Sequence, residues 1–151
     1  MPSTAYTLRR AAHIINFFGL HNGKQFAAAD SNALDIAAAI YFAAENSFPA
    51  EFATDEVTSL AIIGASAPTM AAIRTLSASL PTEPSYMEIV AGHEVPEYIE
   101  HVSNWAATTP VFGEHPPTVA EVTGALHRAA RSARLAQADE ARSFYPHRTA
   151  A

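Results

Sequence analysis

Apolar residues recur at intervals of three and four through most of the chain, which is the spacing of amphipathic helices. The pattern predicts six helices, over residues 4–18, 32–46, 55–65, 67–80, 96–107 and 118–134. Boundary residues support these limits: Ser3 or Thr4 can cap the first helix, and Gly19 can end it. Thr118 and Glu121 have the spacing of a capping box, which marks the start of the last helix.

The segment 32–46 is expected to be the most buried helix. Asn32 and Asp35 stand at capping-box spacing at its start. Large apolar side chains go nearly all round its surface: Leu34, Ile36, Ile40, Tyr41 and Phe42. A helix that is apolar on every side belongs inside a bundle. The sequence therefore predicts an all-α fold, a compact bundle of five or six short helices around residues 32–46, with a single domain over 1–138 and a C-terminal tail over 139–151.

Two segments between these helices are harder to assign. Residues 60–65, LAIIGA, are compatible with a short buried strand, but a helix is favoured because no second strand-like segment is found to pair with it. Residues 81–96 are expected to form a long connection with at most one helical turn. In the helix that follows, Tyr98, Val102 and Trp105 are expected to face the core, and the solvent face is expected to carry Glu97, Glu100, His101 and Asn104.

Charge is distributed unevenly along the chain. Residues 30–121 contain thirteen acidic residues and the single cation Arg74, whereas five of the nine Lys and Arg residues follow residue 121. The net charge of −6 disfavours nonspecific binding to nucleic acid. The absence of cysteine excludes disulfides and thiolate metal sites. Because no apolar run is long enough to span a membrane and the N-terminus lacks a signal-peptide pattern, we expect a cytoplasmic protein without membrane attachment.

No motif in the chain specifies a reaction. Ser66 lies in GASAP, which resembles a nucleophile elbow except that Pro68 stands where the motif needs glycine. The densest group of metal-ligand types does not match a zinc motif, and Pro96 separates its first member from the helix, so a solvated face is favoured: His93, Glu94, Glu97, Glu100 and His101. We therefore expect no catalytic residue, no metal and no cofactor, and a non-enzymatic protein is favoured.

Two helix faces are candidates for protein contacts. In the first helix, one face carries residue types that are enriched in interfaces: Tyr6, Arg10, His13 and Phe17. The alternative for this face is that the rest of the domain covers it. In the last helix, arginines lie within about a 120° arc opposite the packing stripe, namely Arg128, Arg131 and Arg134. Since the acidic middle and this basic face have opposite charge, a charged protein partner or self-association is expected.

Two other functions stay open. Residues 56–80 fit a helix-turn-helix, with Arg74 and Thr75 on the outward side of the second helix. One arginine among alanines is a poor reader of DNA base edges, however, and the net charge also disfavours this function. A small helical enzyme or small-molecule-binding protein would need a polar pocket between helices, and its candidate lining is Tyr41, His101 and Trp105.

The order of the segments resembles that of a known group of proteins. A helix ending in a Gly-containing loop precedes LDIAAAIYFAAE, an alanine-rich amphipathic helix, then YIEHVSNWA with a Pro-rich loop, and finally TVAEVTGALHRAAR. Over residues 7–134 this arrangement resembles a family of small uncharacterised actinobacterial, alanine-rich helical proteins. The resemblance implies no assigned activity and no functional residue. The leading hypothesis is therefore a non-enzymatic cytoplasmic binding or regulatory protein that acts through protein–protein contacts.

Overall fold

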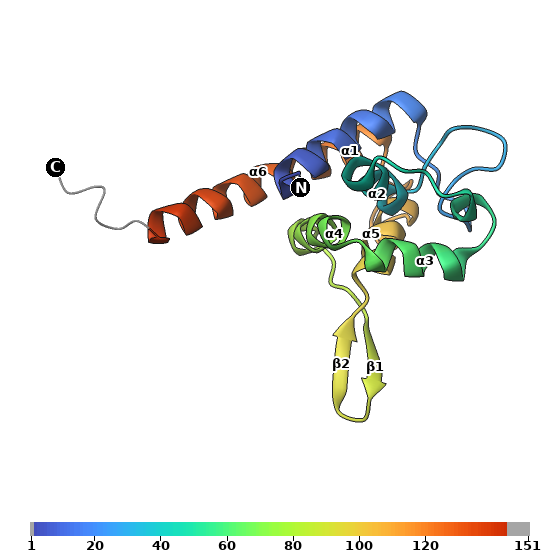
Figure 1. Cartoon of the computed structure of the whole chain (residues 1–151). Helices are drawn as coiled ribbons and strands as arrows, with labels where there is room; N and C mark the ends of the chain where they lie inside the picture. The colour runs from blue at the N-terminus through green and yellow to red at the C-terminus, as the bar shows by residue number, and fades with distance from the viewer. Residues whose placement is uncertain (1, 145–151) are drawn as a thin grey trace.

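The computed structural model describes residues 2–144, and most of them form helices around a shared core (Figure 1). The elements are, in chain order, α1 (Thr4–Phe18), α2 (Ile36–Glu45), the 3-10 helix η1 (Ala50–Ala53), α3 (Glu56–Ala65), α4 (Ala67–Ser79), β1 (Tyr86–Val90), β2 (His93–Pro96), α5 (Tyr98–Ala107) and α6 (Val119–Phe144). The predicted predominance of helix is confirmed, including the helical assignment of LAIIGA. A purely all-α fold is wrong, because β1 and β2 form a two-stranded sheet.

Side-chain caps set the starts of α1 and α6 where the sequence predicted them. Ser3 Oγ accepts a hydrogen bond from the backbone N of Tyr6 at 3.1 Å. Gly19 ends α1 with a φ of 95°, a conformation that favours glycine. At α6, Thr118 Oγ1 accepts from the N of Glu121 at 3.2 Å, and Glu121 Oε1 accepts from the N of Thr118 at 3.3 Å. The capping box is therefore confirmed.

The start of α2 differs from the predicted capping box. Asp35, rather than Asn32, is the N-cap residue, and its Oδ2 accepts from the N of Ala37 at 2.7 Å. The helix is consequently shorter than the predicted 32–46. Its expected burial is confirmed, because residues 36–40 have no exposed surface. A carboxylate thus stands at the first turn of the most apolar helix.

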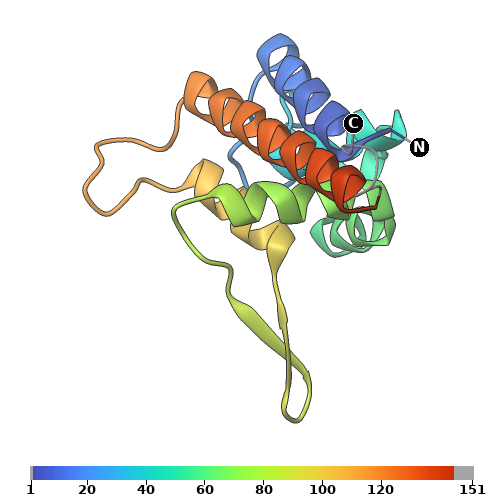
Figure 2. The same ribbon diagram turned by 90° about the vertical axis from the view of Figure 1, so that its left-hand side faces the viewer.

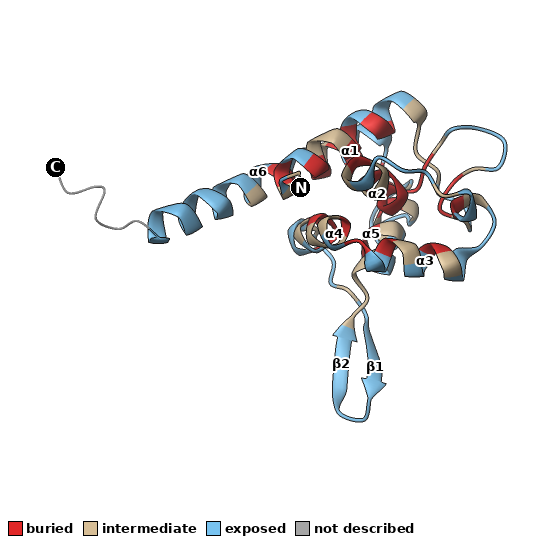
Figure 3. Cartoon of the chain, in the orientation of Figure 1, coloured by how far each residue is buried: buried red, intermediate tan, exposed pale blue. Residues whose placement is uncertain are grey.

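The core lies where α2 and α4 meet the other helices. α4 packs against α1, α2, α3, α5 and α6, and its inward side chains Ala72, Ile73 and Leu76 are fully buried. Phe52 of η1 is also fully buried and meets the ring of Tyr41 edge-on at 5.3 Å. Figure 3 shows the buried residues gathered in this region, while the hairpin and the second half of α6 are exposed.

The hairpin occupies the segment that was expected to be a connection. β1 contains three residues with high β-propensity, Tyr86, Ile89 and Val90, and the turn after it includes Gly92 with a φ of 84°. In the sequence this signal is short, and prolines flank the segment. Length explains the failure of the prediction, because a strand of five residues gives little periodicity to detect.

The paired strands project from the helical body as an arm (Figure 1). They run antiparallel, with Met87 opposite Val95 and Glu88 opposite Glu94. Apart from Pro96, every residue of both strands is exposed. The arm therefore adds no residue to the core.

α6 extends beyond residue 138, where a tail was expected to begin. The helix runs to Phe144, and after Ala133 its residues are exposed. Half of residues 139–144 are good helix formers, namely Glu140, Ala141 and Arg142. The rest of the predicted tail, 145–151, lies outside the described residues. In the described part of the chain, no single helix is both long and apolar enough to cross a membrane.

Candidate functional site

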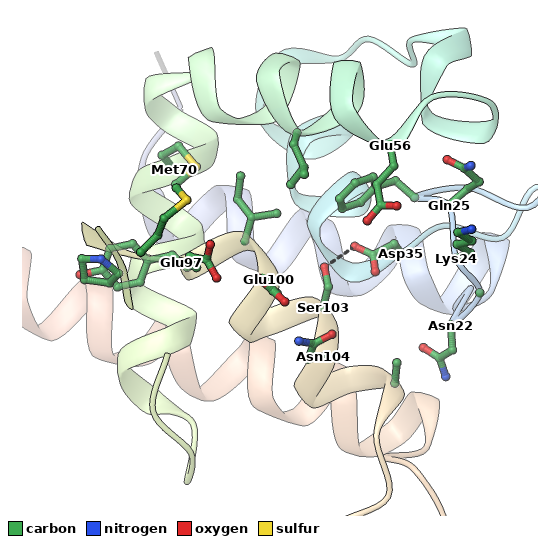
Figure 4. A pocket seen from close by; sticks show the side chains of 18 of the residues that line it. Asn22, Lys24, Gln25, Asp35, Glu56, Met70, Glu97, Glu100, Ser103 and Asn104 are labelled. Carbon is green, nitrogen blue, oxygen red and sulfur yellow. Dashed lines mark hydrogen bonds between the residues drawn. The ribbon is translucent and has the colours of Figure 1, made fainter. Parts of the chain in front are cut away.

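A cavity of about 810 Å³ opens between α3, α4, α5, the base of the arm and the loop 22–26. Its volume is in the range of small-molecule sites. Apolar side chains form much of its wall, among them Phe26, Leu60, Met70, Met87, Tyr98 and Ile99. Figure 4 shows the polar groups that reach it, which include four carboxylates and one ammonium group: Asp35, Glu56, Glu97, Glu100 and Lys24.

Backbone hydrogen bonds hold the loop 22–26 against the start of α2. The N of Asp35 donates to the carbonyl oxygen of Phe26 at 2.8 Å. The next residue, Ala27, donates its N to the carbonyl oxygen of Phe52 at 2.9 Å. These bonds fix Phe26 beside α2, so that the loop forms one wall of the cavity with Asp35 next to it.

Asp35 is the most buried charged group of the cavity, with 7% of its surface exposed. Besides the bond from the N of Ala37, its Oδ2 accepts from Ser103 Oγ of α5 at 2.9 Å (Figure 4). Both of these bonds end on Oδ2, and the backbone N–H of Ala38 also bonds to the carboxylate. Hydrogen bonds from α2 and α5 therefore orient the carboxylate beside the cavity.

Burial dominates the ionisation of Asp35. Loss of solvent raises its pKa from 3.8 to about 6, although the hydrogen bonds from Ala37, Ser103 and Ala38 act in the opposite direction. Near neutral pH the group is therefore charged, but at a free-energy cost to the folded state. A cation in the cavity would reduce this cost, because it favours the charged form.

The other carboxylates carry the same sign along the cavity. Glu100 raises the pKa of Glu97 through a shared hydrogen bond and charge repulsion. Glu56 faces the cavity from α3. Among the described residues, none of the cavity carboxylates forms an ion pair within 4.0 Å. Among the described residues that line the cavity, Lys24 is the only lysine or arginine, so the cavity has an excess of negative charge.

The wall also holds an unsatisfied acceptor. Oε1 of Gln25 is buried and has no hydrogen-bond partner in the described structure. Gln25 lies beside Lys24 in the same loop (Figure 4). Rotation of its amide would turn an oxygen acceptor or two N–H donors to the cavity.

The predicted pocket residues Tyr41, His101 and Trp105 do not line this cavity. His101 and Trp105 border a separate hollow of about 230 Å³ between α5 and the segment after α4, whereas Tyr41 packs on Phe52. His101 was expected on the solvent face of its helix, but it is buried, and Trp105 is only half-buried. The structure therefore brings two of the three together.

Two hydroxyl groups explain the burial of His101. Its Nδ1 lies 2.6 Å from Ser77 Oγ of α4, and its Nε2 lies 2.7 Å from Thr82 Oγ1. Burial lowers its pKa, which keeps the ring neutral near pH 7. Because both ring nitrogens are occupied, His101 joins α4 to α5 rather than presenting a ligand nitrogen with Glu97.

The predicted contact face of α1 is exposed except at Arg10. Tyr6, His13 and Phe17 are exposed, so the alternative that the rest of the domain covers this face is wrong for these residues. Arg10 Nη1 donates to the carbonyl oxygen of Ala43 at 2.8 Å, and its guanidinium lies 5.6 Å from the ring centroid of Phe42. Arg10 therefore caps the C-terminus of α2, which is a structural role.

The arginine face of α6 is exposed as predicted. Arg128, Arg131 and Arg134 all lie at the surface, and none of them forms a hydrogen bond or ion pair with another described residue. His127 of the same helix meets His13 of α1, with 6.2 Å between ring centroids. The two candidate contact faces are therefore neighbours.

The segment proposed as a helix-turn-helix has a bend of 96° between α3 and α4. The second helix is packed on five others, however, so it has little surface for a DNA groove. Arg74 lies over the ring of Tyr98, 5.9 Å from its centroid, and Thr75 Oγ1 donates to the carbonyl oxygen of Ala71 at 3.0 Å. Both candidate base readers thus have partners within the chain.

Ser66 caps α4 rather than meeting a catalytic base. Its Oγ accepts from the N of Thr69 at 3.3 Å and lies 2.6 Å from Glu45 Oε1. In residues 2–144, no group of three or more His, Asp and Glu side chains is placed to hold a metal ion. We therefore take the acid-rich cavity as the candidate functional site.

The sequence did not predict that these acids line one cavity. Asp35 was noted as part of a capping box, and Glu97 and Glu100 as a solvated face. Ser103 and Glu56 were not singled out at all. The one usable signal was an acid at the start of an almost wholly apolar helix, because such an acid has to be buried or neutralised.

Comparison with known proteins places the chain without assigning an activity. The model of a family described as a family of unknown function, DUF6197, matches residues 1–132, and the chain belongs to this family. The expected membership of an uncharacterised family is thus confirmed. No curated protein and no solved structure matches the chain.

Proposed function

We propose that this member of the DUF6197 family binds a small organic cation, an amine or guanidine with an apolar body, in the cavity beside Asp35. The observation that carries the proposal is a buried carboxylate that hydrogen bonds from two helices orient at the edge of a largely apolar cavity. An ammonium or guanidinium group would donate to the carboxylate of Asp35. The proposal concerns binding and assigns no reaction.

The negative charge of the cavity favours a cationic ligand. The cavity carries four carboxylates and one lysine, and burial makes the Asp35 charge costly. An anionic ligand would add to this repulsion, whereas a cation offsets it. Glu97 and Glu100 repel one another at the same cavity, so they favour a cation as well.

Apolar walls select the rest of the ligand. Tyr98, Ile99 and Met70 present carbon and sulfur surface that a hydrocarbon or aromatic body would cover. The base of the arm contributes Met87 and Val95 to the same surface. A hydrophilic cation without such a body would leave these walls in water and bind more weakly.

Three probes with one apolar body separate charge from shape. Phenethylamine, 2-phenylethanol and 3-phenylpropionate share an aromatic ring and a short chain, and they differ in charge. We expect phenethylamine to shift amide signals of loop 22–26 and α5 in a ¹H–¹⁵N titration, the alcohol to act weakly and the carboxylate to have no effect. Asp35→Asn should abolish the response to the amine, and Asp30→Asn, in an exposed loop position, should retain it.

The proposal fails if the three probes bind equally, or if Asp35→Asn leaves the affinity for the amine unchanged. Binding of the carboxylate in preference to the amine would reverse the assigned charge. The predicted protein–protein contacts involve the exposed faces of α1 and α6, so this experiment does not test them.

A further inference from the structure

The two faces of the arm differ in what they meet. Neighbouring residues of a strand point to opposite sides. Met87 and Val95 form a cross-strand pair that lines the cavity. Glu88 and Glu94 form the next pair, on the opposite side, and do not line it. The arm therefore has one face directed to the cavity and one outer face that carries two carboxylates.

The outer face is unfavourable for an isolated arm. Like charges directly opposite in a sheet repel one another. No Lys or Arg occurs between Arg74 and Arg128, so the surrounding sequence supplies no lysine or arginine to offset them. Tyr86, which shares this face by its position two residues before Glu88, is 59% exposed. A two-stranded hairpin without a partner is marginally stable in water.

A basic surface lies elsewhere on the molecule. α1 and α6 run side by side (Figure 2), and the contact between His13 and His127 joins their exposed sides. At 100° per residue, Arg131 and Arg134 lie within about 40° of His127 around α6. We call this the α1–α6 surface, and it consists of Tyr6, Arg9, His13, His127, Arg128, Arg131 and Arg134.

We propose that the Glu88–Glu94 face of the arm docks on the α1–α6 surface of a second copy of this chain. The two surfaces have opposite charge, and both lack ion-pair partners in the described part of their own chain. The arm points away from α1 and α6 (Figures 1 and 2), so one copy does not join its own two surfaces. A contact of this kind is head-to-tail and builds a ring or an open chain unless two copies exchange arms reciprocally.

Charge reversal on each side tests the proposal. One variant carries Arg128→Glu, Arg131→Glu and Arg134→Glu, and a second carries Glu88→Arg and Glu94→Arg. A matched control carries Glu51→Arg and Glu114→Arg, two exposed acids outside both surfaces. Sedimentation velocity and light scattering over a range of protein concentrations, at low and high ionic strength, measure association. Circular dichroism melts confirm that each variant is folded.

We expect the parent to associate at low ionic strength and to dissociate at high ionic strength, because salt screens exposed charges. Each reversal should weaken association by about tenfold or more, while the control associates like the parent. An equimolar mixture of the two reversal variants should associate again, because arginines on one arm then face glutamates on the other copy's α6.

A parent that is monomeric under every condition would overturn the proposal, as would reversal variants that associate like the parent. A mixture that fails to associate would also contradict it. Asp35→Asn should associate normally, so this result is independent of whether the cavity binds a cation.

Discussion

The helical body and the arm hold their shape by different means. Phe52 in the body has no exposed surface, whereas Ile89 in the arm is 62% exposed. Side chains from several helices enclose the first, and only one neighbouring strand supports the second. The difference teaches that stability resides in the body, while the arm's residues are available for contacts. The cavity lies at their border, because Met87 of the arm and Asp35 of the body both line it.

Truncating one apolar side chain in each region should give the largest difference in stability. Phe52→Ala is expected to lower the free energy of unfolding by about 3–5 kcal/mol, because it empties a fully buried aromatic site. Ile89→Ala should change it by no more than about 0.5 kcal/mol. Chemical denaturation of both variants measures the contrast. Equal losses would mean that the arm contributes to the core.

Asp35→Asn should stabilise the body while removing a charge from the cavity. A folded-state pKa of about 6, above the model value of 3.8, means that ionisation opposes folding. The penalty is absent below the unfolded pKa, grows as pH rises between these values, and reaches about 3 kcal/mol above pH 6. Asn retains the helix cap. Denaturation at pH 7 should therefore show a more stable variant, with the gain shrinking toward pH 4. A variant less stable than the parent at pH 7 would contradict the pKa assignment.

Arg10→Ala should destabilise the body to a smaller extent. It removes a charged hydrogen bond to the C-terminus of α2 and a stacking contact with Phe42, at a cost of about 1–2 kcal/mol. Arg9→Ala is a suitable control, since Arg9 has no hydrogen bond to another described residue. Thermal melts of both variants provide the test. The structural role of Arg10 is refuted if the two variants melt at the same temperature.

Glu88→Thr should have the smallest effect on stability, and this effect should be confined to the arm. Replacing one of two opposed carboxylates removes repulsion worth a few tenths of a kcal/mol, about 0.2–1 kcal/mol by analogy with other cross-strand pairs. Amide hydrogen exchange of residues 86–96 should slow, while global stability stays the same. Faster exchange in the arm would show that Glu88 stabilises it.

Much of the helical body follows from local sequence. Ser3, Thr118 and Glu121 located helix ends because a cap acts within three residues of the helix it starts. The arm was missed because a short hairpin depends on the pairing of two strands, neither of which has a clear pattern alone. The length of α6 was underestimated because polar, alanine-rich helix past Ala133 has no buried face to mark it.

The cavity depends on contacts that local patterns do not record. Ser103 donates to Asp35 across 68 positions in the sequence, and no spacing rule connects them. His101 was assigned to the wrong face because its partners, Ser77 and Thr82, lie on other segments. Helical periodicity gives the direction of a side chain around its axis but not the polar groups that pack against it.

The pH dependence of phenethylamine binding, measured by isothermal titration calorimetry, tests the central claim most directly. The amine stays protonated from about pH 5 to about pH 7.5, while Lys24, Glu56, Glu97 and Glu100 are the other charged groups at the cavity. We predict that affinity rises up to about tenfold per pH unit below pH 6 and levels off above it, with the same midpoint in Glu97→Gln. In Asp35→Asn this rise should be lost. A parent whose affinity does not change with pH, or an Asp35→Asn variant that keeps the rise, would contradict the assignment of Asp35 as the cation-binding carboxylate.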